Sequence, residues 1–143
     1  DVCSSDLSSW GEGGFGEVWM NDEVSHAYPL FFRMRGMMEE FRRALVAREK
    51  KGKTAQTRLY RRYYAQMARE LLLFQASDWA FMIHNKSAAD YARFRENTHY
   101  RNVCALYAAA MTGLAMGRKK PDTSLLNKLE NQDNIFPWIG ELL

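Results

Sequence analysis

The sequence has little cysteine, little proline and no long apolar segment. It contains 2 cysteines and 3 prolines among 143 residues. Two cysteines are too few for a disulfide framework, which fits a reducing compartment such as the cytoplasm. No apolar run approaches the ~20 residues that a membrane-spanning helix requires, and no signal-peptide pattern opens the chain. We therefore expect a cytoplasmic protein with no membrane partner.

Charge of neither sign dominates the composition. The formal net charge is +3 with 26% charged residues, so electrostatics restrict the choice of partner only loosely. Apolar residues make up 47% of the chain and aromatic residues 13%, which is ample for a packed core and excludes a disordered chain. A single domain is expected at this length, and folding can bury roughly 68–70% of the extended chain's surface.

A glycine-rich segment lies between two tryptophans near the N-terminus. Residues 11–18 (Gly-Glu-Gly-Gly-Phe-Gly-Glu-Val) match the G-x-G-x-x-G-x-V pattern that covers ATP phosphates in protein kinases. In a kinase, such a loop needs a second strand whose lysine contacts the ATP phosphates. A catalytic aspartate and a metal-binding aspartate must follow later in the chain. Residues 19–23 instead have turn and helix-start chemistry, and no Val-Ala-x-Lys, His-Arg-Asp or Asp-Phe-Gly follows. We therefore reject a kinase and expect an irregular loop.

The rest of the chain has helical periodicity almost to its end. Apolar residues recur at three- and four-residue steps, as in Met34, Met38, Phe41 and Leu45. Either a short turn capped at residues 21–22 ends near Tyr28, or the first long helix begins there with Pro29 near its first position. The pattern predicts helices over about 30–50, 55–83, 87–116 and 123–131, and an extended apolar plug over 133–139. The predicted fold class is all-α: a small bundle of three to four helices preceded by a Gly/Trp-rich irregular loop.

Three sequence motifs, in a fixed order along the chain, resemble those of one known family. They are residues 9–14 (Ser-Trp-Gly-Glu-Gly-Gly), residues 68–81, which contain Arg-Glu-Leu-Leu-Leu, Gln and Ser-Asp-Trp, and Phe136-Pro137 preceded by Asp133. Together they resemble the C-terminal helical domain of 1,4-alpha-glucan branching enzymes of glycoside hydrolase family 57. The resemblance covers roughly residues 8–136, and only residues 51–62 depart from any pattern of the family. Residues 1–7 have no counterpart, and we expect them to be a non-native or fragment-start segment before a domain over 8–143.

The resemblance implies a chemistry that this chain shares with a missing partner domain. In such enzymes a β/α barrel provides a Glu nucleophile and an Asp general acid, and a glucan 6-hydroxyl replaces water as the acceptor of the glucosyl-enzyme. Those two carboxylates are not in this sequence, so we expect the chain alone to be catalytically inactive. The implied partners are an α-glucan substrate, as in glycogen biosynthesis, and the barrel domain. No cofactor is implied.

The same resemblance implies substrate-binding residues in the glycine-rich loop. Trp10 and Trp19 match two tryptophans near the active site, where indole rings stack on sugars and exclude water. Gly13 and Gly14 then allow the backbone to approach the glucan closely. Asp78 and Trp79 are possible secondary substrate contacts. The alternative for each tryptophan is ordinary core packing, and for Asp78 a cap or an ion pair with an arginine.

Other polar residues have simpler explanations. Glu12 and Glu17 are expected to be solvated or bonded to the barrel, because a small loop offers an acid/base pair no preorganised environment. His26, His84 and His99 lack the spacing of metal ligands, so we expect ordinary surface or core histidines and no metal site. The predicted catalytic set of this chain is empty.

A basic segment supports the alternative class of function. Residues 42–62 contain nine Lys and Arg residues, opposed within the segment only by Glu49, and Tyr60, Tyr63 and Tyr64 lie among or directly after them. This composition is compatible with a helical module that binds nucleic acid or another protein. We favour a solvated hairpin tip, because the charges flank a loop and do not line one recognition face. Nucleic acid is therefore an unlikely partner.

Overall fold

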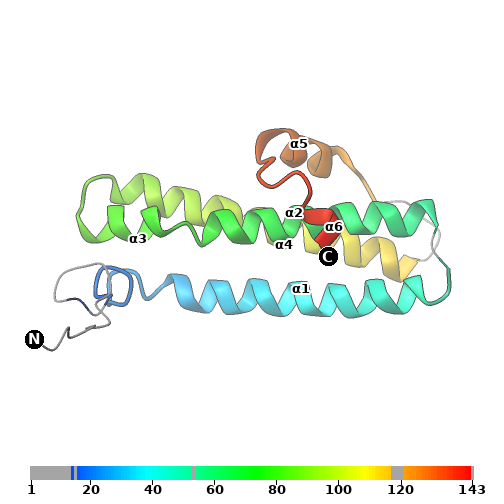
Figure 1. The fold of residues 1–143 in the computed structure, drawn as a ribbon, viewed down its shortest axis with the longest axis horizontal. Coiled ribbons are helices and arrows are strands. Elements are labelled where there is room, and N and C mark those ends of the chain that lie inside the picture. The colour runs from blue at the N-terminus through cyan, green and yellow to red at the C-terminus, as the bar shows by residue number, and fades with distance from the viewer. Residues whose placement is uncertain (1–13, 15, 53, 117–120, 143) are drawn as a thin grey trace, which may run out of the picture.

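A computed structural model describes residues 14, 16–52, 54–116 and 121–142. Within these residues every regular element is helical, which confirms the all-α class (Figure 1). None of the helices in this part of the chain is long and apolar enough to cross a membrane. The helices are α1 (Ala27–Glu49), α2 (Ala55–Phe74), α3 (Ser77–His84), α4 (Ala89–Met116), α5 (Ser124–Gln132) and α6 (Ile139–Leu142).

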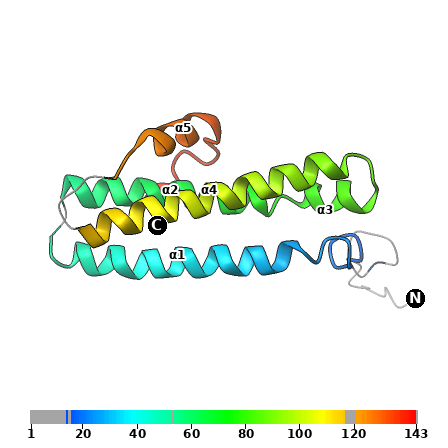
Figure 2. The ribbon, with the colours of Figure 1, turned by 180° about the vertical axis from the view of Figure 1, so that it is seen from behind.

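Three long helices form the body of the molecule. Helices α1, α2 and α4 lie side by side in both views, and α5 and α6 cover α2 from outside (Figures 1 and 2). The predicted apolar stripe of α1 is confirmed, since Met34, Met38, Phe41 and Leu45 are all buried. These side chains pack against Tyr60, Met67 and Leu106 in one continuous core. Burial of this stripe is what holds the bundle together.

Helix α1 begins close to the predicted position near Tyr28, and a separate turn precedes it. The helix begins at Ala27, so Pro29 occupies its first turn, where a missing N–H breaks no intrahelical hydrogen bond. Asn21 caps the preceding turn instead of the helix. Its Oδ1 accepts hydrogen bonds from the backbone nitrogens of Glu23 (2.9 Å) and Val24 (3.2 Å). The loop before α1 is therefore folded back on itself.

The prediction of one helix over 55–83 is wrong. Helix α2 ends at Phe74, and Ala76 is extended (φ −57°, ψ 124°) before α3 begins at Ser77. The backbone nitrogens of Gln75 and Ala76 donate to the last carbonyls of α2. The indole N–H of Trp79 donates to one of them, the Leu73 carbonyl, at 2.7 Å. This side chain stabilises an interruption that has neither glycine nor proline in it.

The C-terminal tail is fastened to α2 and is not entirely extended. Residues 139–142 form the one-turn helix α6, and Ile139 is buried against the core. Arg69 of α2 donates to the carbonyls of Ile135 (2.9 Å) and Pro137 (3.1 Å). Between these carbonyls Phe136 adopts a left-handed backbone (φ 45°). The predicted plug over 133–139 is correct in its position on the bundle, but its last residue, Ile139, begins a helical turn.

Candidate functional site

One end of the bundle brings Trp19 to the break between α2 and α3. The Trp19 indole N–H donates to the Ser77 carbonyl at 3.2 Å, 58 residues along the chain. The Tyr28 hydroxyl in turn donates to the Trp19 carbonyl at 2.7 Å. Figures 1 and 2 both show the segment before α1 and helix α3 at this same end. The loop and the Ser-Asp-Trp word therefore meet at one surface.

A pocket of about 320 Å³ opens at this surface. Its walls are mostly aromatic and aliphatic, with a few polar groups from the helix break and from α4. Such a composition is typical of small-molecule sites, in which apolar walls surround a few placed polar groups. The lining residues are Trp19, Val24, Ala27, Tyr28, Phe31, Phe32, Phe74, Gln75, Ala76, Ser77, Ala80 and Glu96.

The predicted loop residues lie only partly within the described structure. Gly14 and Gly16 have positive φ angles of 81° and 78°, a conformation that favours glycine. The Gly16 carbonyl then accepts from the backbone nitrogens of Trp19 (2.9 Å) and Met20 (3.0 Å), which closes a turn. Trp10 and Gly13 lie outside the described residues. The glycines at 14 and 16 thus shape the turn that presents Trp19.

Asp78 and Trp79 point to different parts of this end. Asp78 is exposed in the first turn of α3, where a carboxylate suits the positive end of the helix dipole. Trp79 is half-buried, bonds to Leu73 and contacts Tyr91 edge to face at a centroid distance of 6.2 Å. Asp78 is therefore a solvent-exposed carboxylate at the start of α3, whereas Trp79 supports the helix break.

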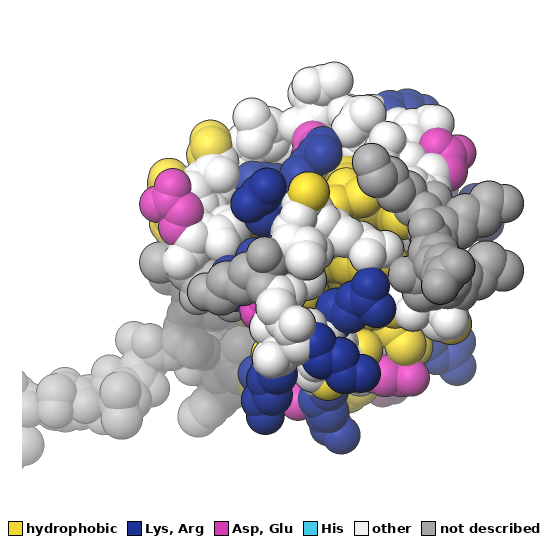
Figure 3. All heavy atoms as spheres, turned by 90° about the vertical axis from the view of Figure 1, so that its right-hand side faces the viewer, with side chains coloured by type: hydrophobic (Ala, Val, Ile, Leu, Met, Phe, Trp, Pro, Cys, Tyr) yellow, Lys and Arg dark blue, Asp and Glu magenta, His cyan; other side chains and the backbone are white. Residues whose placement is uncertain are grey.

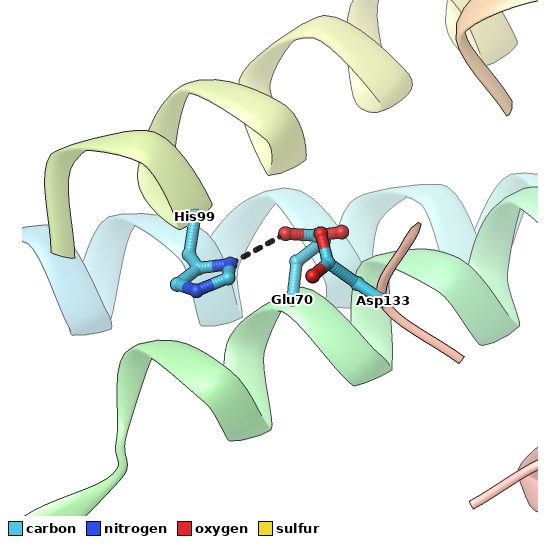
Figure 4. Close-up of side chains that lie close together, drawn as sticks. All are labelled: Glu70, His99 and Asp133. Atoms are coloured by element: carbon cyan, nitrogen blue, oxygen red, sulfur yellow. Dashed lines mark hydrogen bonds and ion pairs between the residues drawn. The ribbon is translucent and has the colours of Figure 1, made fainter. Parts of the chain in front are cut away.

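A second polar cluster lies inside the bundle. Glu70 of α2, His99 of α4 and Asp133 after α5 are all buried, and their ligand atoms lie within 4.8 Å of one another (Figure 4). Glu70 accepts hydrogen bonds from Nδ1 of His99 (2.7 Å), from Asn102 (3.0 Å) and from Gln66 (2.9 Å). These bonds connect α2 to α4.

The hydrogen bonds determine which nitrogen of His99 bears the proton. Arg95 can only donate, and its Nη2 lies 3.0 Å from Nε2 of His99, so Nε2 accepts. Nδ1 is then the protonated nitrogen and donates to Glu70. A metal ion bound at Nδ1 would have to displace this proton and turn Nε2 into a donor facing Arg95. The bonding pattern therefore favours a hydrogen-bonded cluster over a metal centre.

Sequence reasoning did not identify this cluster. His99 was expected to be an ordinary histidine, and Glu70 appeared only inside a family word. A signal was nevertheless present, because Glu70 follows Met67 and precedes Phe74 at the helical spacing of the apolar stripe. A carboxylate at such a position must find partners when the helix packs. The identity of those partners was not contained in the local pattern.

Asp133 is the incompletely satisfied member of the cluster. Its Oδ2 is buried and has no hydrogen-bond partner in the described part of the chain. Burial, together with the nearby Glu70 carboxylate, raises the pKa of the Asp133 carboxyl. A raised pKa in the folded state means that this group supports folding at low pH. That support is lost as the pH rises through the folded-state value.

We expect Asp133→Asn to stabilise the protein by about 1 kcal/mol at pH 7, because it removes a buried charge whose hydrogen bonds are incomplete. The gain should shrink toward zero at a pH below the unfolded-state pKa of an aspartate, about 3.9, where the native Asp133 is protonated. Urea unfolding of both proteins at the two pH values measures this difference. A variant less stable than the parent protein at pH 7 would contradict the assignment.

Asp122→Asn is the matched control, because the pKa of Asp122 is shifted in the opposite direction. The Ser124 hydroxyl and backbone N–H donate to the exposed Asp122 carboxylate and lower its pKa. A lowered pKa stabilises the fold above the unfolded value and loses that effect as the pH falls. This substitution should therefore destabilise the protein at pH 7 and have less effect at low pH.

Four of the nine cations of the basic segment at the opposite end pair with nearby carboxylates. Figure 3 shows Lys and Arg side chains gathered there, with Asp and Glu among them. Arg42 and Arg43 both bond to Glu39 and lower the pKa of its carboxyl to about 2. Arg61 pairs with Glu49, and Arg62 with Glu130. This pairing matches a solvated hairpin tip and leaves nucleic-acid binding without structural support.

A family model described as "1,4-alpha-glucan branching enzyme, C-terminal" matches residues 37–142. Among curated proteins, the chain is 33% identical over 139 residues to the 1,4-alpha-glucan branching enzyme TK1436 of Thermococcus kodakarensis, covering 93% of this chain and 19% of the relative. It is 34% identical over 135 residues to a probable branching enzyme, Rv3031, of Mycobacterium tuberculosis, covering 90% and 23%. The chain thus spans about a fifth of the length of these relatives.

Solved structures share the fold at similar identity. The crystal structure of TK1436, described as a branching enzyme of glycoside hydrolase family 57 in complex with glucose and additives, matches with a TM-score of 0.77 and 32% identity. That match covers 92% of this chain and 22% of the other. The branching enzyme of Pyrococcus horikoshii matches with a TM-score of 0.75 and 31% identity, covering 91% and 23%.

Proposed function

This chain belongs to the family of 1,4-alpha-glucan branching enzyme C-terminal domains, and from that premise we propose that it is the helical part of an enzyme that makes α-1,6 branches in a glucan. Its partner is a catalytic barrel domain that provides the Glu nucleophile and Asp general acid. Its substrate is a glycogen-type α-glucan in the cytoplasm. The observation that best supports this proposal is the hydrogen bond from Trp19 to Ser77. It lies at the end of the bundle where the Ser-Asp-Trp motif begins α3.

The domain's own contribution is binding and exclusion of water. The covalent glucosyl-enzyme must react with a sugar hydroxyl and not with water, so the acceptor side of the site has to be dry. Trp19 is partly exposed and fixed through its N–H and its carbonyl, which makes it a rigid apolar surface. We propose that Trp19 and Trp10 contact the glucan, and that Gly13 and Gly14 let the backbone pass close to it. Asp78 is proposed as a secondary hydrogen-bonding group, with Trp79 supporting it.

A domain exchange tests this function. The C-terminal domain of the Thermococcus kodakarensis relative is replaced by this chain, and branching of amylose is followed by iodine colour and reducing ends. We expect the chimera to branch amylose, and this chain alone to show no activity. Branching by the pure chain alone, or a folded chimera that only hydrolyses, would contradict the proposal. The relative's enzyme without any C-terminal domain is the control.

A further inference from the structure

Glu96 is a buried carboxylate in the wall of the pocket beside Trp19. The residue is only 4% exposed, on α4, yet it lines the cavity. Its Oε2 accepts a hydrogen bond from Nε2 of His26 at 2.8 Å. Within the described chain this is the only hydrogen bond that the carboxylate makes, so Oε1 is left for another donor. Oε1 is not fully buried and belongs to a residue that lines the pocket, so it can accept a hydrogen bond from a molecule bound there.

The other walls define the shape of that ligand. Phe31, Phe32 and Tyr28 from α1 face Trp19 and the helix break across a volume of about 320 Å³. Phe32 is 61% exposed and Tyr28 is 42% exposed, so these walls present apolar surface to a molecule in the pocket. The volume lies within the ~300–1,000 Å³ range of small-molecule sites. A ligand with apolar faces and hydroxyl edges matches these walls.

The charges around Glu96 favour a neutral donor over a cation. Nη1 of Arg93 lies 3.4 Å from Nδ1 of His26, so a guanidinium already stands behind the histidine that bonds to Glu96. The positive charge of Arg93 offsets the negative charge of the Glu96 carboxylate. A cation in the pocket would therefore gain little electrostatic attraction to Glu96. An anionic ligand would be repelled by Glu96. Sugar hydroxyls need neither sign of charge.

We propose that this pocket is a glucan subsite of the helical domain itself, binding one glucosyl residue of an α-glucan chain. Glu96 accepts hydrogen bonds from the sugar hydroxyls, His26 holds the carboxylate in place, and Phe32 packs on the apolar face of the ring. The proposal rests on the proposed function for the identity of the sugar. The residues that form the subsite come from the geometry of this pocket.

Titration of the 143-residue chain with maltoheptaose tests the subsite, using calorimetry and tryptophan fluorescence. Glu96→Gln keeps an acceptor for His26 but replaces the charged oxygen that faces the sugar, so we expect about tenfold weaker binding by a variant that circular dichroism shows to be folded. Phe32→Ala should weaken binding by a similar factor. The matched controls are the exposed Glu141→Gln and Phe94→Ala, since Phe94 is 64% exposed but lies outside the pocket. Both should bind like the parent chain.

The outcomes separate this proposal from the proposed function. Absence of maltoheptaose binding by the chain, or equal binding by Glu96→Gln, Phe32→Ala and the controls, would overturn the subsite even if the chimera branches amylose. Binding of tetramethylammonium that Glu96→Gln abolishes would assign the pocket to organic cations and overturn it as well. Glu96-dependent maltoheptaose binding together with an inactive chimera would support the subsite and refute the branching function.

Discussion

Replacing Glu70 by alanine should lower the free energy of unfolding by about 3–5 kcal/mol, because it leaves buried donors without their acceptor and opens a cavity in the bundle. Glu70 is fully buried and accepts from Gln66, His99 and Asn102. The buried Nδ1–H of His99 would lose its acceptor, and so would Asn102, whereas Gln66 would keep the carbonyls of Leu129 (3.3 Å) and Asp133 (3.5 Å). The measurement is urea unfolding followed by helical circular dichroism. Such a loss is a large fraction of the stability of a typical domain of this size.

Two further variants make the Glu70 result interpretable. Glu70→Gln retains one oxygen acceptor and should cost about 1–3 kcal/mol, so it remains measurable if the alanine variant does not fold. Glu39→Ala removes an exposed carboxylate that also bonds to two cationic side chains, and it should leave stability almost unchanged. Equal effects of Glu70→Ala and Glu39→Ala would show that the buried cluster contributes nothing special.

Trp19→Ala in the chimeric enzyme should lower branching by about 10- to 100-fold while leaving most of the stability intact. Loss of an aromatic platform costs on the order of 1–3 kcal/mol in other polymer-binding sites, and ~1.4 kcal/mol is one decade in rate. Trp19 is only partly buried, and its indole makes one hydrogen bond, to Ser77. Hydrolysis should rise relative to branching, since the smaller side chain admits water to the glucosyl-enzyme.

Phe41→Ala provides the comparison for a purely structural residue. Phe41 is fully buried in the bundle, so its truncation should cost about 3–5 kcal/mol of stability, with any activity loss following the fraction unfolded. If Trp19→Ala instead lowers the melting temperature as strongly and keeps the ratio of branching to hydrolysis, its substrate role is wrong. We expect Trp10→Ala to behave like Trp19→Ala, although Trp10 lies outside the described structure.

Local patterns were sufficient for the long helices. The stripe from Met34 to Leu45 follows helical periodicity, and a face of that width has to be buried against other helices. The class and most of the helix limits follow from this requirement. The break at residues 75–76 does not, because Gln75 and Ala76 are compatible with a continuous helix. The interruption depends on Trp79 bonding back to Leu73 and packing against Tyr91.

By itself the sequence determined an all-α domain and the motifs of its family, since periodicity and motifs are local properties. Only the tertiary structure decided that Trp19 bonds to Ser77 and that Glu70, His99 and Asp133 share one buried cluster. It likewise decided that Glu96 and His26 meet at a pocket. These groups are 29 to 70 residues apart in sequence where bonded, and only the packing of helices against one another brings them together.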